Sequence, residues 1–526
     1  MKQMKPKTNF ENHDLKKNGR VRTVILSPPS LQDNIADAER LTGALAQQLK
    51  TRHIYLDQAL MPTISRRLRK WDYQARCLIN IDGANLRVSH LMGPRDDRIL
   101  AGVAVDLGTS RIVLRLVNLA DGQHLAETSF DNPQINIAPD VLARIHFCET
   151  GNGLSKLRSL VVDALNSHIK TLVEDQGLSV EDVYLMTMAG NTTMTHLFLG
   201  LDPHWLIREP YIPVVNRPGL IGTRSLGIKI HPRANIYIFP NVGSYFGGDL
   251  IAGILYSGLY TSDETAILVD VGTNAEVVLG NKDWMMACAG AAGPALEGGV
   301  TKMGMMACSG AIDRIKIDPV SGEFKIHIID EMPPVGICGS GVIDLAAALF
   351  KAGLIDIRGK LIPKRCQNRF SEKNGIQFLQ VVPAKDSATK EDLAITQADL
   401  DSLIRSKAAM YTILETISTT MGISLADLST FYIAGTFGSF INPESAITIG
   451  MIPDLPLERY HSLGNSSLGG ATMALLSHTI QARAEKIRDE ITYLELNVNQ
   501  EFMNRFSAAK FLPHTDPSRF PSVKNY

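Results

Sequence analysis

Two stretches of this 526-residue chain repeat one pattern, an apolar run that ends in Asp, an apolar residue, Gly and Thr. They read AVDLGTS at 104–110 and LVDVGTN at 268–274. A second apolar run follows each copy, and turn residues at 121–122 and 280–281 then reverse the chain. The repeated unit is therefore a β-meander. Two such meanders, each followed by helical stretches, predict an α/β fold made of two related lobes.

A strand that ends in an Asp-x-Gly-Thr turn is suited to phosphate. Glycine leaves the backbone N–H groups uncovered, so they form a cradle for an anion, and the carboxylate is a hard oxygen ligand for Mg²⁺ or its waters. One turn from each lobe can then hold the phosphates and metal of ATP in a cleft between the lobes. The predicted catalytic and magnesium-organising residues, acting on the metal through water, are Asp106 and Asp270. The predicted phosphate contacts are Gly108, Thr109, Ser110, Gly272, Thr273 and Asn274.

Further candidates lie in glycine-rich stretches. Gly435 and Gly438 in AGTFG follow an apolar strand, where glycine allows the backbone to approach adenosine closely. Asn191 and Thr192 in AGNTT could contact the terminal phosphate or the lobe hinge, but helix capping explains these residues equally well. The remaining two candidates could orient a nucleophilic water or form a salt bridge or cap, and they are Asp249 and Glu297.

The motifs DLGTS, DVGTN and AGTFG resemble the ATPase motifs of the actin, sugar-kinase and heat-shock-chaperone superfamily, over about residues 99–480. This resemblance implies two ribonuclease H-like lobes. Longer stretches, among them MAGNTTMTHLFLGLDP, PNVGSYFGGDLIAGIL and GICGSGVIDLAAAL, resemble the reductive activators of corrinoid proteins from about residue 22 onward. The expected domains are a flexible tail at 1–20, a small α+β module at 21–98, lobe I at 99–263 and lobe II at 264–526.

The resemblance implies an ATPase that returns the cobalt of a methyltransferase system's corrinoid protein from Co(II) to Co(I). Members commonly carry a ferredoxin-like domain, whereas neither end of this sequence has the clustered cysteines of an iron–sulfur centre. We therefore expect no cluster in this chain and a separate low-potential donor of ferredoxin or flavodoxin type. A second departure is Ala289 and Gly290 before AAGP, where the family often has a hydroxyl side chain, which argues against ligation of cobalt by this loop.

Composition and charge bear on the partners and the cellular location that we expect for this protein. The 53 Lys and Arg residues balance 54 Asp and Glu residues, which argues against nucleic acid as a partner. The polar N-terminus lacks the apolar core of a signal peptide, and the longest apolar stretch is too short to span a bilayer, so we expect a cytoplasmic protein without a membrane partner. A homodimer stays open. Two other functions also stay open, a small-molecule kinase of the same superfamily and a nucleotide-gated conformational ATPase or binding module.

Overall fold

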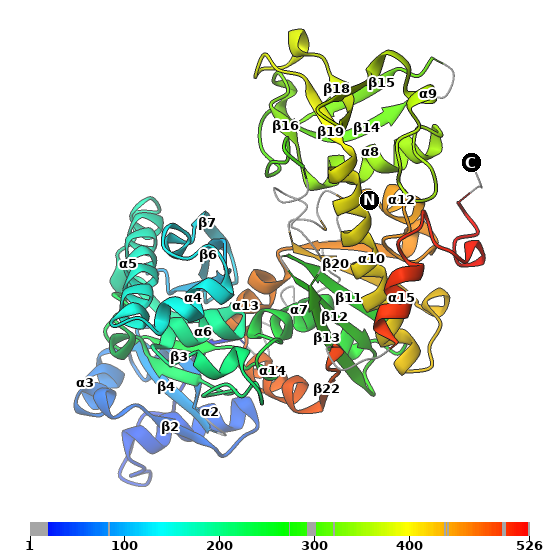
Figure 1. Ribbon diagram of the computed structural model, residues 1–526. Coiled ribbons are helices and arrows are strands. Elements are labelled where there is room, and N and C mark those ends of the chain that lie inside the picture. The colour runs from blue at the N-terminus through cyan, green and yellow to red at the C-terminus, as the bar shows by residue number, and fades with distance from the viewer. Residues whose placement is uncertain are drawn as a thin grey trace. The chain divides into compact units, whose positions relative to one another are not determined.

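The computed structural model describes residues 19–523 apart from 83–84, 273, 292–300, 319–320, 436–437, 439–440 and 497–500 (Figure 1). The chain forms two compact units that alternate along the sequence. The N-terminal unit contains residues up to 256 together with 466–490, and the C-terminal unit contains 257–465 and 491 onward. Among the described residues, no helix is both long and apolar enough to cross a bilayer.

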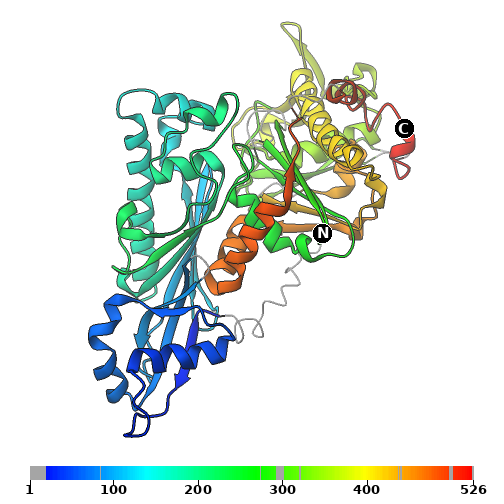
Figure 2. The ribbon, with the colours of Figure 1, turned by 90° about the horizontal axis from the view of Figure 1, so that it is seen from below.

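The N-terminal unit begins with a four-stranded sheet in the order β1-β3-β4-β2, drawn in blue (Figure 1; Figure 2). Two helices with apolar residues at helical spacing pack on it, and they bury Leu41, Leu45, Ile64 and Leu68. The strands and helices of this module are β1 (Val21–Ile25), α2 (Asp37–Leu49), β2 (Ile54–Leu56), α3 (Met61–Lys70), β3 (Gln74–Asp82) and β4 (Asn85–Met92).

The second sheet of this unit has six strands in the order β7-β6-β5-β8-β10-β9. Three strands form an antiparallel meander, and β8 and β10 then continue the sheet parallel to β5. Its strands are β5 (Ala101–Leu107), β6 (Arg111–Asn118), β7 (His124–Asp131), β8 (Val183–Gly190), β9 (Gly219–Gly222) and β10 (Asn235–Ile238). The helices of the unit are α4 (Val141–Cys148), α5 (Gly153–Glu174), α6 (Thr192–Leu199), α7 (Gly248–Ser257), α13 (Ser466–Leu476) and α14 (His478–Glu490).

The C-terminal unit repeats this arrangement. Its main sheet has the order β21-β20-β11-β12-β13-β22, so β13-β12-β11-β20-β21 corresponds strand for strand to β7-β6-β5-β8-β10. Strands β11, β12 and β13 form the meander, and β20 and β21 run parallel to β11. The strands are β11 (Ala266–Val271), β12 (Asn274–Gly280), β13 (Met285–Ala291), β20 (Thr430–Ala434), β21 (Tyr460–Gly464) and β22 (Ile491–Tyr493). The predicted α/β fold with two ribonuclease H-like lobes is confirmed.

Two small sheets complete the C-terminal unit, with strand orders β15-β14-β16 and β17-β18-β19. Their strands are β14 (Ala311–Ile317), β15 (Phe324–Ile328), β16 (Gly336–Ile337), β17 (Phe370–Lys373), β18 (Ile376–Val382) and β19 (Leu393–Thr396). The helices are α8 (Gly339–Lys351), α9 (Pro363–Cys366), α10 (Gln397–Thr420), α12 (Pro443–Thr448) and α15 (Phe502–Ala508). Helix α10 holds the C-terminal segment, because the buried ammonium of Lys407 donates to the carbonyl oxygens of Phe511 and Pro513, both at 2.7 Å.

Candidate nucleotide-binding turns

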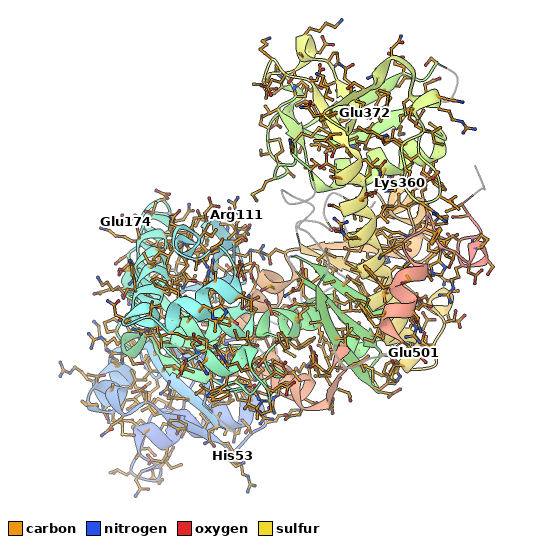
Figure 3. All side chains as sticks on the ribbon, viewed as in Figure 1. His53, Arg111, Glu174, Lys360, Glu372 and Glu501 are labelled. Atoms are coloured by element: carbon orange, nitrogen blue, oxygen red, sulfur yellow. The ribbon has the colours of Figure 1, made fainter. Side chains whose placement is uncertain are left out.

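The first Asp-x-Gly-Thr turn follows β5, just before Arg111, which Figure 3 labels. Strand β8 runs parallel to β5, with Asp106 opposite Ala189, so the ends of both strands reach the same edge of the sheet. The stretch after β8 therefore meets the turn. The Nδ2 of Asn191 donates to Thr109 Oγ1 at 2.9 Å, and its Oδ1 accepts from the N–H of Met194 at 2.9 Å. Asn191 thus caps α6 and fixes the turn hydroxyl at the same time.

The carbonyl groups of this turn are also held by side chains. Asn132 Nδ2 donates to the oxygen of Gly108 at 2.9 Å, and Arg144 Nη2 donates to that of Thr109 at 2.7 Å. A Cβ on Gly108 would lie 2.3 Å from the carbonyl oxygen of Arg111, so no side chain fits there. Two side chains thus hold the turn, and position 108 requires glycine because the turn's own backbone fills the space that a Cβ would occupy.

Asp106 receives a hydrogen bond from a distant part of the chain. Ser467 Oγ, near the start of α13, donates to Asp106 Oδ1 at 2.8 Å across a separation of 361 residues. Helix α13 packs on β5 and β8, and Thr187 Oγ1 of β8 donates to its Ala471 oxygen at 2.7 Å. The sequence analysis did not find Ser467, since nothing in SSLGG distinguishes it from an ordinary helix start.

The other end of α13 is capped by the fully buried guanidinium of Arg20. Its Nη2 donates to the oxygen of Ala474 at 2.6 Å and its Nε to that of Leu475 at 3.1 Å. Burial lowers the pKa of Arg20 to about 9. A cation at a helix C-terminus satisfies carbonyl groups that have no partner within the helix. Arg20 therefore fixes the helix that carries Ser467, and sequence reasoning missed it as well.

Asp249 lies at the same edge of the N-terminal unit. A Cβ on Gly247 would lie 2.4 Å from Cα of Asn191 and 2.5 Å from Oδ1 of Asp249, so glycine lets the two residues approach each other. Asp249 is in the first turn of α7, where a carboxylate is favourable for the helix dipole. Thr192, the remaining candidate at this edge, donates from Oγ1 to the oxygen of Gly243 at 2.8 Å.

The second turn follows β11 in the C-terminal unit. Strand β20 is parallel to β11, with Asp270 opposite Ala434. Gly435 has φ +80°, and a Cβ there would lie 2.9 Å from Asp270 Oδ1, so this position requires glycine for two reasons. Gly438 also packs closely against backbone, because a Cβ there would lie 2.7 Å from the carbonyl oxygen of Ile433. The structure thus brings Asp270 and the glycine-rich loop together.

The rest of this turn is tight, since the N–H of Gly272 donates to the oxygen of Asn274 at 2.9 Å. Thr273 and Glu297 lie outside the described residues. Ala289 and Gly290 are in β13, and Ala289 pairs with Glu276 of β12.

Both turns fit a magnesium–nucleotide ligand in their chemistry. Each presents one carboxylate beside backbone that only glycine can form, and Mg²⁺ is commonly bound by one or two carboxylates, waters and substrate phosphates. Among the described residues, no group of three or more His, Cys, Asp or Glu side chains gathers as a metal site. A metal bound at these turns would need ligands beyond their side chains, such as nucleotide phosphates and water.

Known protein families and structures are similar to this chain over nearly all of its length. Three family models match consecutive parts of it: the RACo linker region at 11–95, the RACo middle region at 101–262, and the C-terminal domain of RACo, the ASKHA domain, at 264–524. A solved structure of a reductive activator for corrinoid, iron–sulfur protein is 37% identical, with a TM-score of 0.84, and the match covers 96% of this chain and 81% of that one.

Two relatives with assigned functions are also similar. The corrinoid activation enzyme RamQ of Eubacterium limosum is 30% identical over 434 residues, which are 81% of this chain and 72% of RamQ. The [Co(II) methylated amine-specific corrinoid protein] reductase of Methanosarcina barkeri is 25% identical over 440 residues, 77% of this chain and 75% of that protein. With the linker, middle and ASKHA regions in the same order and close similarity along most of its length, this chain belongs to the RACo family.

Proposed function

We propose that this protein uses ATP to drive the reductive activation of a corrinoid protein in a methyltransferase system. The observation that carries the proposal is the similarity to a reductive activator over 96% of the chain. The names of both relatives point to the same chemistry, since one is a corrinoid activation enzyme and the other a reductase of a Co(II) corrinoid protein. In the reaction, one electron converts Co(II) to Co(I), and a separate low-potential donor of ferredoxin or flavodoxin type supplies it.

ATP is needed because the electron transfer is uphill from ordinary donors. About 10 kcal/mol of coupled free energy corresponds to about 0.4 V for one electron. ATP binding and hydrolysis can supply this energy only if the nucleotide states of the protein bind the corrinoid partner with different affinity. We place this activity in the cytoplasm.

In this proposal the two Asp-x-Gly-Thr turns bind the nucleotide. Asp106 and Asp270 hold the waters of Mg²⁺, and the turn residues donate backbone N–H and hydroxyl hydrogen bonds to the phosphates; these turn residues are Gly108, Thr109, Ser110, Gly272, Thr273 and Asn274. When bound, the metal neutralises charge on the transferred phosphate. Gly435 and Gly438 lie against adenosine. Asn191 holds the Thr109 hydroxyl in place at 2.9 Å, and Asp249 or Glu297 orients the attacking water.

The test is spectroscopic. The purified protein, a corrinoid protein held as Co(II) and a low-potential reductant are mixed with ATP, and the absorption of the cobalt is followed. We expect conversion to Co(I) only with ATP, together with ATP hydrolysis stimulated by the Co(II) partner. Two controls omit the protein or replace ATP by a non-hydrolysable analogue.

Asp106→Asn separates catalysis from fold, because the amide is the same size as the carboxylate but lacks its charge. We expect this variant to keep the unfolding midpoint of the parent and to lose ATP-dependent Co(I) formation. Co(I) formation at the same rate without ATP, or no stimulation by any corrinoid protein tried, would refute the proposal.

A further inference from the structure

A cavity of about 490 Å³ lies within the N-terminal unit, between its small α+β module and its ribonuclease H-like lobe. One wall is formed by α3 and Trp71 and another by Glu181, Asp182, Tyr184 and His231, and the end of β4, Asp96 and Arg98 complete the lining. Its volume is in the range of small-molecule sites. The cavity is formed without any residue of the two Asp-x-Gly-Thr turns.

Positive charge collects on the α3 wall. Arg66, Arg67 and Lys70 line the cavity. Arg233 does not line it, but its Nη2 donates to Nδ1 of the lining residue His90 at 3.0 Å. Arg67 donates to the carbonyl oxygen of Leu91. Within the described part of the chain, none of these four cations forms an ion pair with Asp or Glu.

Other cations nearby do have acidic partners. Arg69, on the same helix, pairs with Asp37 at 2.7 Å, and Arg98, which itself lines the cavity, pairs with the lining residue Asp96 at 2.6 Å. Burial and the charge of Arg233 lower the pKa of Arg67. Uncompensated cations around a cavity favour an anionic ligand.

The floor of the cavity is aromatic. The rings of His90 and Tyr184 have centroids 4.7 Å apart, and those of Tyr184 and His231 are 4.5 Å apart. Burial, then the charge of Arg233, lowers the pKa of His90 to about 3, so its ring is neutral at physiological pH. His90, His231 and Trp71 are partly exposed and line the cavity, so a planar group bound there can contact aromatic rings.

The wall opposite α3 carries carboxylates. Glu181 is exposed and lines the cavity, as does Asp182, whose carboxylate accepts the N–H of Ser179 at 2.9 Å. Unpaired cations, aromatic rings and carboxylates therefore line one cavity, together with the Arg98–Asp96 pair. A complementary ligand has an anionic group at one end, a planar ring, and hydrogen-bond donors at the other end.

We propose that this cavity binds a nucleotide, with its phosphate on Arg66 and Lys70, its base against the aromatic floor and the donor groups of the base toward Glu181. This site is separate from the two turns and goes beyond the proposed function. Because protein cations hold the phosphate, binding requires no divalent metal. The site can therefore be measured in EDTA, which removes metal-dependent binding elsewhere.

The experiment is equilibrium dialysis of the full chain against AMP, GMP, CMP and UMP in EDTA at low salt. We expect at least one of them to bind with a Kd below about 1 mM and to bind more tightly than ribose 5-phosphate or inorganic phosphate, which lack the base. Arg66→Ala/Lys70→Ala should raise this Kd about tenfold or more. Both residues are exposed, so the variant should fold, and its unfolding midpoint verifies this.

Arg69→Ala is the control, since it removes one positive charge from the same helix outside the cavity and should leave the Kd unchanged. Glu181→Gln should weaken the nucleotide without affecting ribose 5-phosphate. Three results would each overturn the proposal: no binding of any of the four nucleotides at about 1 mM, equal binding by inorganic phosphate, or a Kd that the double variant does not change. A cavity that instead receives an acidic protein would give the first of these results.

Discussion

Ser467 is the residue whose role the structure defines most sharply, because its hydroxyl donates to Asp106 at 2.8 Å. Ser467→Ala removes this donor and leaves a half-buried carboxylate oxygen with one hydrogen bond fewer, at a cost of about 1 kcal/mol. We expect the kcat of ATP hydrolysis to fall about five- to tenfold. Thr472→Ala is the control, since its hydroxyl lies on the same helix but bonds to Leu468 and Arg115. Equal rates for Ser467→Ala and the parent would mean that the hydrogen bond does not orient Asp106.

His90 makes stability depend on pH. Its pKa is about 3 in the folded protein and about 6.5 when unfolded, so between these values the unfolded chain binds the extra proton. The contribution of neutral His90 is therefore complete above pH 6.5 and is lost as pH falls toward 3. In this pH range the free energy of unfolding falls by at most about 1.4 kcal/mol for each pH unit of acidification.

Urea unfolding at pH 7, 6 and 5 measures this dependence. His90→Gln should flatten it by about 1 kcal/mol per pH unit below 6, whereas His53→Gln, at an exposed position that Figure 3 labels, should leave it unchanged. If His90→Gln had the same pH slope as the parent, groups other than His90 would be the cause of the acid sensitivity.

At the scale of elements, α13 is the helix on which the N-terminal turn depends. It follows β21 of the C-terminal unit in sequence, yet belongs to the N-terminal unit and packs on β5 and β8. Arg20 caps its C-terminal end, and Ser467 near its N-terminal end holds Asp106. Arg20, near the start of the chain, and α13, near its end, thus support the carboxylate of Asp106.

Arg20→Met keeps the length of the side chain but leaves the carbonyl groups at the end of α13 without donors. We expect a loss of about 1–3 kcal/mol in unfolding free energy, faster hydrogen exchange in α13 and slower ATP hydrolysis. Arg52→Met, at an exposed position, is the control and should change none of the three. A stability loss without faster exchange in α13 would contradict the capping role.

At the scale of the whole molecule, the two units share one strand order and each provides one Asp-x-Gly-Thr carboxylate. If both carboxylates act on one nucleotide, their removal is not additive. We expect Asp106→Asn and Asp270→Asn each to lower the kcat of ATP hydrolysis at least about 100-fold, and the double variant to be little slower than either. Additive losses, with all variants folded by thermal unfolding, would show that the two aspartates act independently.

Local residue patterns were enough to predict the repeated unit of this fold. Turn chemistry and strand patterning are local, so AVDLGTS and LVDVGTN predicted two meanders, and the sheet orders confirm them. The same local logic predicted a loop at Gly435 that depends on glycine, and the positive φ of this residue and its close approach to Asp270 explain why glycine is needed there. The roles of the site residues in nucleotide binding stay predictions.

The surroundings of these turns depend on contacts between elements that are far apart in the sequence. Ser467 and Arg20 act through contacts that span 361 and 454 residues, and such contacts leave no periodic pattern in a sequence. The cations on α3 take part in a cavity only because a second wall packs beside this helix, and the sequence of α3 alone does not reveal that wall. Hydrophobic period and turn residues specify an element from its neighbours in the chain, whereas hydrogen bonds and unpaired charge depend on which distant elements packing brings together.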